Sequence, residues 1–404
     1  MAQKLKFGNG TWATKEGSTL AYNDENNNFK PLPFSFTRNS IATRVNKEGL
    51  IEVVGNDKPR IDYTDSADGV LLLENSATNL NTLSDPTDAQ KGSTSYASVT
   101  YQDNFNWGLG NVINNAIVFL DNSTTRYAYY NSSVTSGTQY TLSFFIKMDD
   151  NSIPIPATDF LIVLAGTSFA SGYNVESYGN NVYRVSVSGA AGASNTANGI
   201  LKVASHSTKG FKISAFQLEA NSVASSYIPT NGSSVQRAAE TCNGAGNSEV
   251  FSDSSGVLFA NISPLDNDVA ISLSDNTFNN SISFGVYLDK ISAVVRKDGG
   301  YITSGIIDTS NNAFNNNKIA IKYNSSSCDF YVNGFVIGSS SGVTYSSDVL
   351  DNLNFDRGSG HDDFYGKTKE VGYYDTALTD LELETLTSYR SLNELVTELN
   401  LNTL

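Results

Sequence analysis

The sequence predicts an all-β protein of tandem antiparallel β-sandwich or jelly-roll modules, with short helices only at the C-terminus. Three observations support this class. Short runs of alternating apolar and polar residues dominate the chain, and Gly, Asn and Ser separate these runs. No long helical periodicity occurs before residue 378. A chain of 404 residues is also too long for one sandwich, so we expect two or three modules.

Composition and charge exclude several functional classes. Charged residues make up only 17% of the chain, and the net charge is -15 without a compensating Lys/Arg cluster, which disfavours nucleic-acid binding. Cys242 and Cys328 lack metal-ligand or redox spacing, so we expect two buried free thiols, as in a protein assembled in a reducing cytoplasm. Residues 1–6 lack a signal-peptide core, and no run reaches membrane-spanning length, so we expect neither secretory export nor membrane insertion.

Residues 1–33 contain a short ordered motif followed by an Asn-rich run, which is typical of an anchor and a linker. Phe7 and Trp12 are the candidates for attachment to a partner protein, because tryptophan often dominates interfaces. Local packing of Trp12 is the alternative. We favour attachment, since so short a segment has little core of its own.

Residues 34–82 form a β segment in which three arginines alternate with apolar positions: Arg38, Arg44 and Arg60. A ligand site is one interpretation of these arginines. Pairing with acidic residues is favoured, because the guanidinium fork matches a carboxylate. The nearby candidates for such pairing are Asp62, Asp65 and Glu74.

The same segment contains a nearly continuous motif of about 45 residues. Its elements are Phe36, Arg38, Ala42 to Asn46, Gly49 to Glu52, Pro59 to Tyr63 and Leu71 to Leu80. This motif is similar to a segment that recurs in bacteriophage tail-fibre and other virion adhesion proteins.

Residues 83–236 form a middle module of short strands. In the strand at 210–219, a period of two places Phe211, Ile213 and Ala215 on one face and Phe216 and Leu218 on the other. The end of the module resembles a jelly-roll, carbohydrate-binding-like module of phage fibres. The matching positions are Gln217 to Glu219, Ser226 to Thr230 and Val235 to Glu240.

Residues 237–390 form the last module. Alternation at 328–338 around Asn333-Gly334 predicts a hairpin with a type I′ turn. Thr379 and Glu382 predict a capping box at the start of a helix. Ile319 to Tyr323, Tyr331 to Gly334, Gly366 to Val371 and Ala377 to Leu383 together resemble the C-terminal half of a laminin-G-like, concanavalin A-like sandwich.

Residues 391–404 predict a second capped helix with an apolar stripe. Two interpretations of this stripe are equally favoured. It packs on its own sandwich, or it is a seam for self-association or for docking on another virion protein.

No constellation for catalysis is present in the sequence. Strands carry no closely spaced acidic pair of the glycosidase type, and there is no nucleophile elbow, phosphate-binding loop or Cys/His zinc spacing. We therefore expect a non-enzyme without a cofactor other than calcium. Asp356, Asp362 and Asp363 lie in a Gly-rich loop and could ligate Ca²⁺ through oxygen, and an exposed acidic turn is the alternative.

Exposed aromatic rings are the usual stacking surface for sugars. We consider five candidates for glycan binding: Tyr101, Trp107, Tyr130, Tyr345 and Tyr365. With 21 Tyr and 21 Phe in the chain, any single ring is more readily explained by packing.

The resemblances imply a bacteriophage virion protein, a tail-fibre, head-fibre or spike subunit on the outer surface of the particle that adheres to host-surface polysaccharide without catalysis. Its partners would be other phage structural proteins, bound through the N-terminal segment, and further copies of itself, with a trimer favoured. A polysaccharide depolymerase and a purely structural decoration or connector protein are the alternatives.

Overall fold

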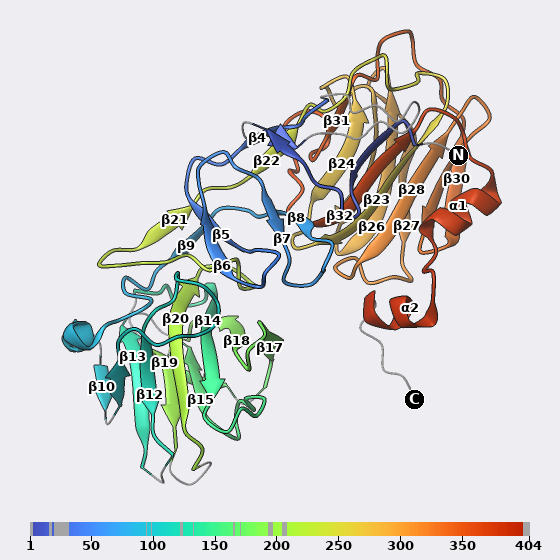
Figure 1. Cartoon of the computed structure of the whole chain (residues 1–404). Coiled ribbons are helices and arrows are strands. Elements are labelled where there is room, and N and C mark those ends of the chain that lie inside the picture. Colours follow the sequence, from blue (N-terminus) through green and yellow to red (C-terminus); the bar gives the residue numbers. More distant parts are fainter. Residues whose placement is uncertain are drawn as a thin grey trace. The chain divides into compact units, whose positions relative to one another are not determined.

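The computed structural model describes residues 3–15, 18–19, 32–93, 95–97, 99–121, 124–131, 133–164, 166–169, 171–192, 197–203 and 208–398. The chain forms two compact units. Unit 1 comprises Met1–Arg38, Asn56–Asn75 and Ala239–Leu404, and unit 2 comprises Asn39–Gly55 and Ser76–Ala238. Antiparallel strands dominate both units, which confirms the predicted all-β class (Figure 1).

The segment 34–82 is divided between the units. Residues 34–38 and 56–75 belong to unit 1, whereas residues 39–55 and 76–82 belong to unit 2. The division therefore does not coincide with the predicted module boundaries, because strands from this segment join both sheet systems.

Unit 1 is a sandwich of two sheets. The first sheet has the order β30 (Phe335–Ser341), β29 (Ser327–Val332), β28 (Asn317–Tyr323), β23 (Gly256–Pro264), β32 (Gly366–Tyr374), β8 (Val70–Leu73) and β7 (Arg60–Asp62), and β1 (Leu5–Gly8) also pairs with β32. The second has the order β27 (Gly300–Asp308), β26 (Lys290–Lys297), β25 (Ser281–Tyr287), β24 (Val269–Ser274) and β31 (Asn352–Asn354). Two short pairs complete it, β4 (Ser35–Thr37) with β22 (Thr241–Asn243) and β2 (Thr14–Lys15) with β3 (Ser18–Thr19).

Both faces of β23, a central strand of the first sheet, are buried. Leu258, Ala260 and Ile262 of β23 belong to the core between the two sheets. The alternate residues Val257 and Phe259 pack in a separate cluster with Leu383 of helix α1 (Asp380–Thr387). The helix therefore covers the outer face that period-two alternation would otherwise leave in water.

The two local motifs predicted in unit 1 are confirmed. Asn333 and Gly334 have φ values of 50° and 88°, as a type I′ turn requires. Thr379 and Glu382 form both hydrogen bonds of the capping box. Helix α2 (Leu392–Glu398) is the second predicted helix.

In the part of the chain that the structure describes, no helix combines the length and the apolar character needed to cross a bilayer.

Unit 2 is also a sandwich of two antiparallel sheets. One has the order β11 (Thr100–Gln102), β12 (Ala116–Phe119), β20 (Phe211–Glu219), β14 (Gln139–Met148), β18 (Tyr183–Ala190) and β17 (Tyr173–Ser177). The other has the order β10 (Ser95–Ala97), β13 (Arg126–Asn131), β19 (Ala197–Lys202), β15 (Leu161–Leu164) and β16 (Thr167–Phe169). The pair β9 (Ala77–Asn79) with β21 (Val235–Arg237) and the 3₁₀ helix η1 (Asp88–Ser93) belong to the same unit.

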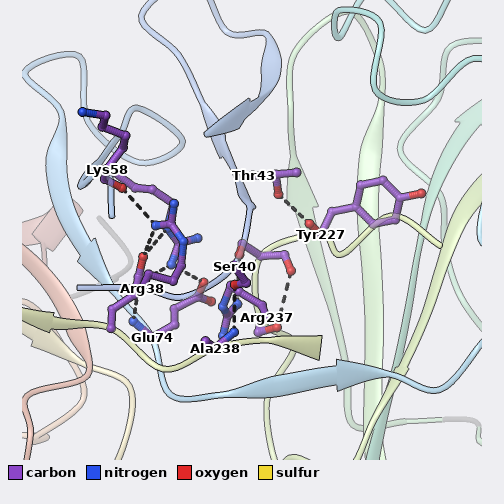
Figure 2. A network of polar contacts seen from close by, with 12 residues as sticks. Arg38, Ser40, Thr43, Lys58, Glu74, Tyr227, Arg237 and Ala238 are labelled. Carbon is purple, nitrogen blue, oxygen red and sulfur yellow. Dashed lines mark hydrogen bonds and ion pairs between the residues drawn. The ribbon is translucent and has the colours of Figure 1, made fainter. Parts of the chain in front are cut away.

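A hairpin adds a second core to unit 2. Strands β5 (Ala42–Val45) and β6 (Ile51–Val54) place Val45 and Ile51 against Trp107 and Phe145. The Thr43 hydroxyl fixes the hairpin by donating to the carbonyl oxygen of Tyr227 at 2.6 Å (Figure 2). The segment 39–55 thus buries the outer face of the β14–β20 sheet.

The predicted faces of strand β20 are wrong from Ala215 onward. Ala215 has a φ of 54°, and the register with β14 shifts between Ser143 and Phe145, which marks a β-bulge. The extra residue places Phe216 and Leu218 in the same core as Phe211 and Ile213 and leaves Ala215 in the second core.

Both cysteines are buried and free, as predicted. Burial, together with the nearby charge of Asp329, raises the pKa of the Cys328 thiol to about 11. That thiol is therefore protonated and unreactive at neutral pH.

Candidate functional site

The predicted attachment residues belong to unit 1. Residues Leu5–Gly8 form strand β1, which pairs with β32, and Phe7 is 2% exposed in the core. Trp12 is half-buried against the same core and donates its indole N–H to the carbonyl oxygen of Gly69 at 3.2 Å. This corrects the assignment of Phe7 as an attachment residue, because the segment completes a sheet. The contacts of Trp12 agree with the alternative interpretation, local packing.

The three aspartates predicted to bind calcium are engaged by protein groups. Asp356 is 3% exposed, and its carboxylate accepts hydrogen bonds from the amides of Gly358 and Gly360. Asp362 pairs with Arg357, and Asp363 accepts from a tyrosine hydroxyl. Within the described ranges, no group of three or more His, Cys, Asp or Glu side chains could hold a metal ion, so the structure gives the calcium prediction no ligand set.

Three of the five predicted glycan-stacking aromatics are core residues. Trp107 is 1% exposed and donates its indole N–H to Asn115. Tyr130 is 4% exposed and packs on Phe216. Tyr345 is 8% exposed and donates its hydroxyl to the carbonyl oxygen of Arg296. Their assignment to a ligand surface is corrected, because none offers a free ring face.

The other two predicted aromatics are half-buried. Tyr101 packs against the core of unit 2, and Tyr365 packs against the core of unit 1. Burial, and then the neighbouring Asp363, raise the pKa of Tyr365 to about 12. Their role in glycan binding stays a prediction.

The arginines of segment 34–82 pair with carboxylates, as the sequence favoured. Arg44 pairs with Glu52 on the surface at 2.7 Å, and Arg60 pairs with the predicted Glu74 at 2.8 Å. Arg38 is fully buried, and its guanidinium also donates to the carbonyl oxygen of Lys58 (Figure 2). Arg38 and Arg60 are therefore buried parts of the fold that a ligand cannot reach, whereas Arg44 lies on the surface.

The structure instead brings two other tyrosines together in unit 2. Tyr127 and Tyr129 are two residues apart on β13, so they share one face of the strand, while Ala128 and Tyr130 face the core. Their rings are stacked, with centroids 4.9 Å apart and planes inclined by 21°. Both are half-buried. We call this pair the tyrosine platform.

A glycine gives the tyrosine platform room on the sheet. Gly199 is the cross-strand partner of Tyr129, and a Cβ atom there would lie 2.0 Å from the carbonyl oxygen of Ala128. Because only glycine fits, no side chain competes with the Tyr129 ring at this position. Burial, and then the neighbouring Tyr127, raise the pKa of Tyr129, so its hydroxyl stays neutral at physiological pH.

The tyrosine platform has the chemistry that sugars need. In the stacked pair each ring covers one face of the other, so an outer ring face is the apolar surface that could receive the C–H face of a pyranose, and each phenol can donate or accept a hydrogen bond. The sequence signal was the Tyr-x-Tyr spacing on a predicted strand. The sequence prediction is Tyr130 instead, because alternation alone does not say which face is buried.

No protein-family model matches the chain, and no curated protein sequence matches it significantly. Among solved structures, it is similar to the CBM40 of a Ruminococcus gnavus IT-sialidase, with 16% identity, a TM-score of 0.31, and coverage of 36% of this chain and 94% of that one. A heptameric SAP-like pentraxin from Limulus polyphemus has 14% identity and a TM-score of 0.28, over 34% of this chain and 71% of that one.

A third similar structure spans more of the chain. The binding domain of Paraclostridial Mosquitocidal Protein 1 has 12% identity and a TM-score of 0.24, over 76% of this chain and 51% of that one. These TM-scores are too low for the similarities to support a functional argument.

Proposed function

We propose that the protein is a non-catalytic adhesion subunit of a bacteriophage virion, a fibre or spike that binds host-surface glycans. The tyrosine platform of Tyr127 and Tyr129 carries the adhesive part of this proposal. The similarity of residues 34–82 and 217–240 to phage-fibre segments supports the virion part. The partners are other structural proteins of the particle and further copies of the chain, with a trimer favoured.

A shallow platform suits this role. Two half-buried rings give a small contact area, so a single site binds weakly. Several copies on one particle convert weak contacts into firm attachment, because each bound site raises the effective concentration of the next. A low charged fraction of 17% also suits a surface that meets neutral polysaccharide.

The test is binding of the purified full chain to an array of neutral and acidic bacterial oligosaccharides. Replacing both rings, Tyr127→Ala with Tyr129→Ala, should abolish binding, because the stacking surface disappears. The double change to Phe should retain partial binding, since the stack stays and only the hydroxyls are lost. Tyr287→Ala is the matched control, because Tyr287 is 46% exposed in unit 1 and forms no ring pair with another residue that the structure describes.

Two outcomes would overturn the proposal in different ways. Continued release of new reducing ends from a host polysaccharide would identify a depolymerase. An array without hits, together with unchanged adsorption of virions whose subunit lacks both rings, would identify a structural connector.

A further inference from the structure

An aromatic and cationic cluster lies in unit 1, far in sequence from the tyrosine platform. The guanidinium carbon of Arg296 lies 4.1 Å from the ring centroid of Phe278 and 4.5 Å from that of Tyr301. The two rings are nearly perpendicular, at 80°. The guanidinium carbon of Arg357 lies 5.2 Å from the centroid of the same Phe278 ring. We call these four residues the arginine cluster.

The sheet register builds this cluster. Arg296 on β26 is the direct cross-strand partner of Tyr301 on β27. Phe278 comes from the turn between β24 and β25, and Arg357 from the loop after β31. Residues on a paired register lie side by side on one face, so the contact between Arg296 and Tyr301 is fixed by backbone hydrogen bonds.

The two arginines differ in their counter-charge. Arg357 forms an ion pair with Asp362. Arg296 donates to the carbonyl oxygen of Gly299 and forms no ion pair with any residue that the structure describes. Its Nε atom is buried without a hydrogen-bond acceptor. The buried Nε is closed to a ligand, but a guanidinium has five N–H donors and Arg296 is only half-buried, so its Nη groups retain donor capacity that no described contact uses.

An unused guanidinium edge is notable in a chain with a net charge of -15, where carboxylates are abundant. Ring contacts satisfy the faces of the guanidinium and leave its in-plane N–H groups for an acceptor. Tyr301 is 56% exposed, so a ring face lies open beside this edge. The arrangement offers stacking and a bidentate anion contact at neighbouring positions.

We propose that the arginine cluster binds an acidic sugar, with the pyranose ring on Tyr301 and its anionic substituent on Arg296. A carboxylate or a sulfate supplies the two oxygens that match the guanidinium fork. This inference rests on the proposed adhesive function and adds a separate, acid-selective site in unit 1 to the one proposed in unit 2. Asp298, on the turn beside Arg296, is the acidic side chain nearest in sequence that would oppose binding.

The test compares acidic oligosaccharides with chemically matched neutral ones. The probes are oligogalacturonate, oligosialic acid and oligoalginate, each with its methyl ester, and a sulfated galactan with its desulfated form. We expect the full chain to bind at least one acidic form about tenfold more tightly than its neutral counterpart. Arg296→Gln should remove that preference, and Arg296→Lys should restore only part of it, because lysine lacks the planar fork.

Controls separate this inference from the proposed function. Arg44→Gln removes a surface arginine of unit 2 and should leave the preference intact. Thermal unfolding of each variant checks that the fold persists. If neutral sugars bind through Tyr127 and Tyr129 and no acidic form is preferred, the inference is wrong and the adhesive function stands. If no saccharide of either kind binds, both are wrong.

Discussion

Arg60 and Glu240 form a bidentate ion pair in which both side chains are completely buried. Arg60 Nε donates to Glu240 Oε1 at 2.9 Å, and Nη2 donates to Oε2. Glu240 also accepts from Arg38 Nη1 at 2.6 Å and from the amide of Glu74 at 2.9 Å. One carboxylate therefore joins three separate stretches of unit 1.

These stretches meet where the chain leaves and re-enters unit 1. Arg38 ends the first stretch, Glu74 lies one residue before the end of the second, and Glu240 is the second residue of the third. The Arg38 amide also donates to Asp57, near the start of the second stretch, at 2.8 Å. We infer that this cluster closes unit 1 around the insertion of unit 2 in its sequence.

Glu240→Gln should destabilise unit 1 by about 3–5 kcal/mol, because two buried guanidinium groups lose their shared counter-charge. Arg60 cannot escape by losing its proton. In the parent chain burial alone would lower its pKa, but the carboxylates of Glu240 and Glu74 outweigh burial and raise it above the ordinary arginine value. In the variant Glu74 remains, and a guanidinium keeps its proton in proteins. The measurement is urea unfolding followed by ¹⁹F NMR of 5-fluorotryptophan, since Trp12 reports unit 1 and Trp107 reports unit 2.

Glu52→Gln is the matched control for that experiment. It breaks the exposed pair with Arg44 in unit 2 and should cost less than about 1 kcal/mol. Equal losses of unfolding free energy in the two variants would show that burial does not increase the contribution of the Glu240 cluster to stability.

The acid stability of unit 1 should depend on Asp329. Burial raises the pKa of this carboxyl, but hydrogen bonds from Lys322, Ser339 and Ser327 outweigh burial and hold the pKa below its ordinary value. The unfolded chain then binds the proton more tightly than the folded one. The contribution of Asp329 is thus complete above its unfolded pKa of about 4 and is lost as pH falls through the lower folded pKa.

Asp329→Asn should therefore flatten the decline in unit 1 stability below about pH 4, while reducing stability at neutral pH. The readout is the Trp12 transition midpoint in urea at a series of pH values. If the midpoint of the variant falls with pH as steeply as that of the parent, other carboxylates cause the loss of stability in acid.

The bulge at Ala215 makes a third prediction. A β-branched side chain is strained at a φ of 54°, and this position is 1% exposed against tightly packed rings. Ala215→Val should destabilise unit 2 by about 1–3 kcal/mol. Ile213→Val on the same strand is the control, with an expected loss of about 0.5–1.5 kcal/mol. If Ala215→Gly proves more harmful than Ala215→Val, backbone strain does not govern this site.

Local chemistry explains what the sequence could predict. Two predicted features depend only on residues close in sequence, namely the Asn333-Gly334 turn and the Thr379 capping box. A third, the pairing of Arg60 with Glu74, depends on the attraction of opposite charges. The bulge at Ala215 breaks the period of two without a distinctive residue, so alternation assigned the wrong face after it.

Other features depend on contacts between distant residues. Strand β1 pairs with β32, which is separated from it by most of the sequence, and nothing within residues 5–8 indicates that partner. Tyr127 and Tyr130 lie on opposite faces of one strand, and the covering sheet decides which face is buried. The spacing of Tyr127 and Tyr129 could therefore have indicated that they share one face of a strand, but it could not indicate that this face is exposed.

Gly334→Ala should destabilise unit 1 for two separable reasons. A Cβ atom there would lie 2.5 Å from the Ser388 hydroxyl oxygen, and the φ of 88° strains any L side chain. Ser388→Ala removes the contact and keeps the strain. In a double-mutant cycle on the Trp12 transition, we expect Ser388→Ala to recover part of the loss caused by Gly334→Ala, with a coupling energy above about 0.5 kcal/mol. Additive losses of unfolding free energy would mean that strain in the turn accounts for the whole effect of Gly334→Ala. The position of the hairpin would then not depend on the residues that follow α1.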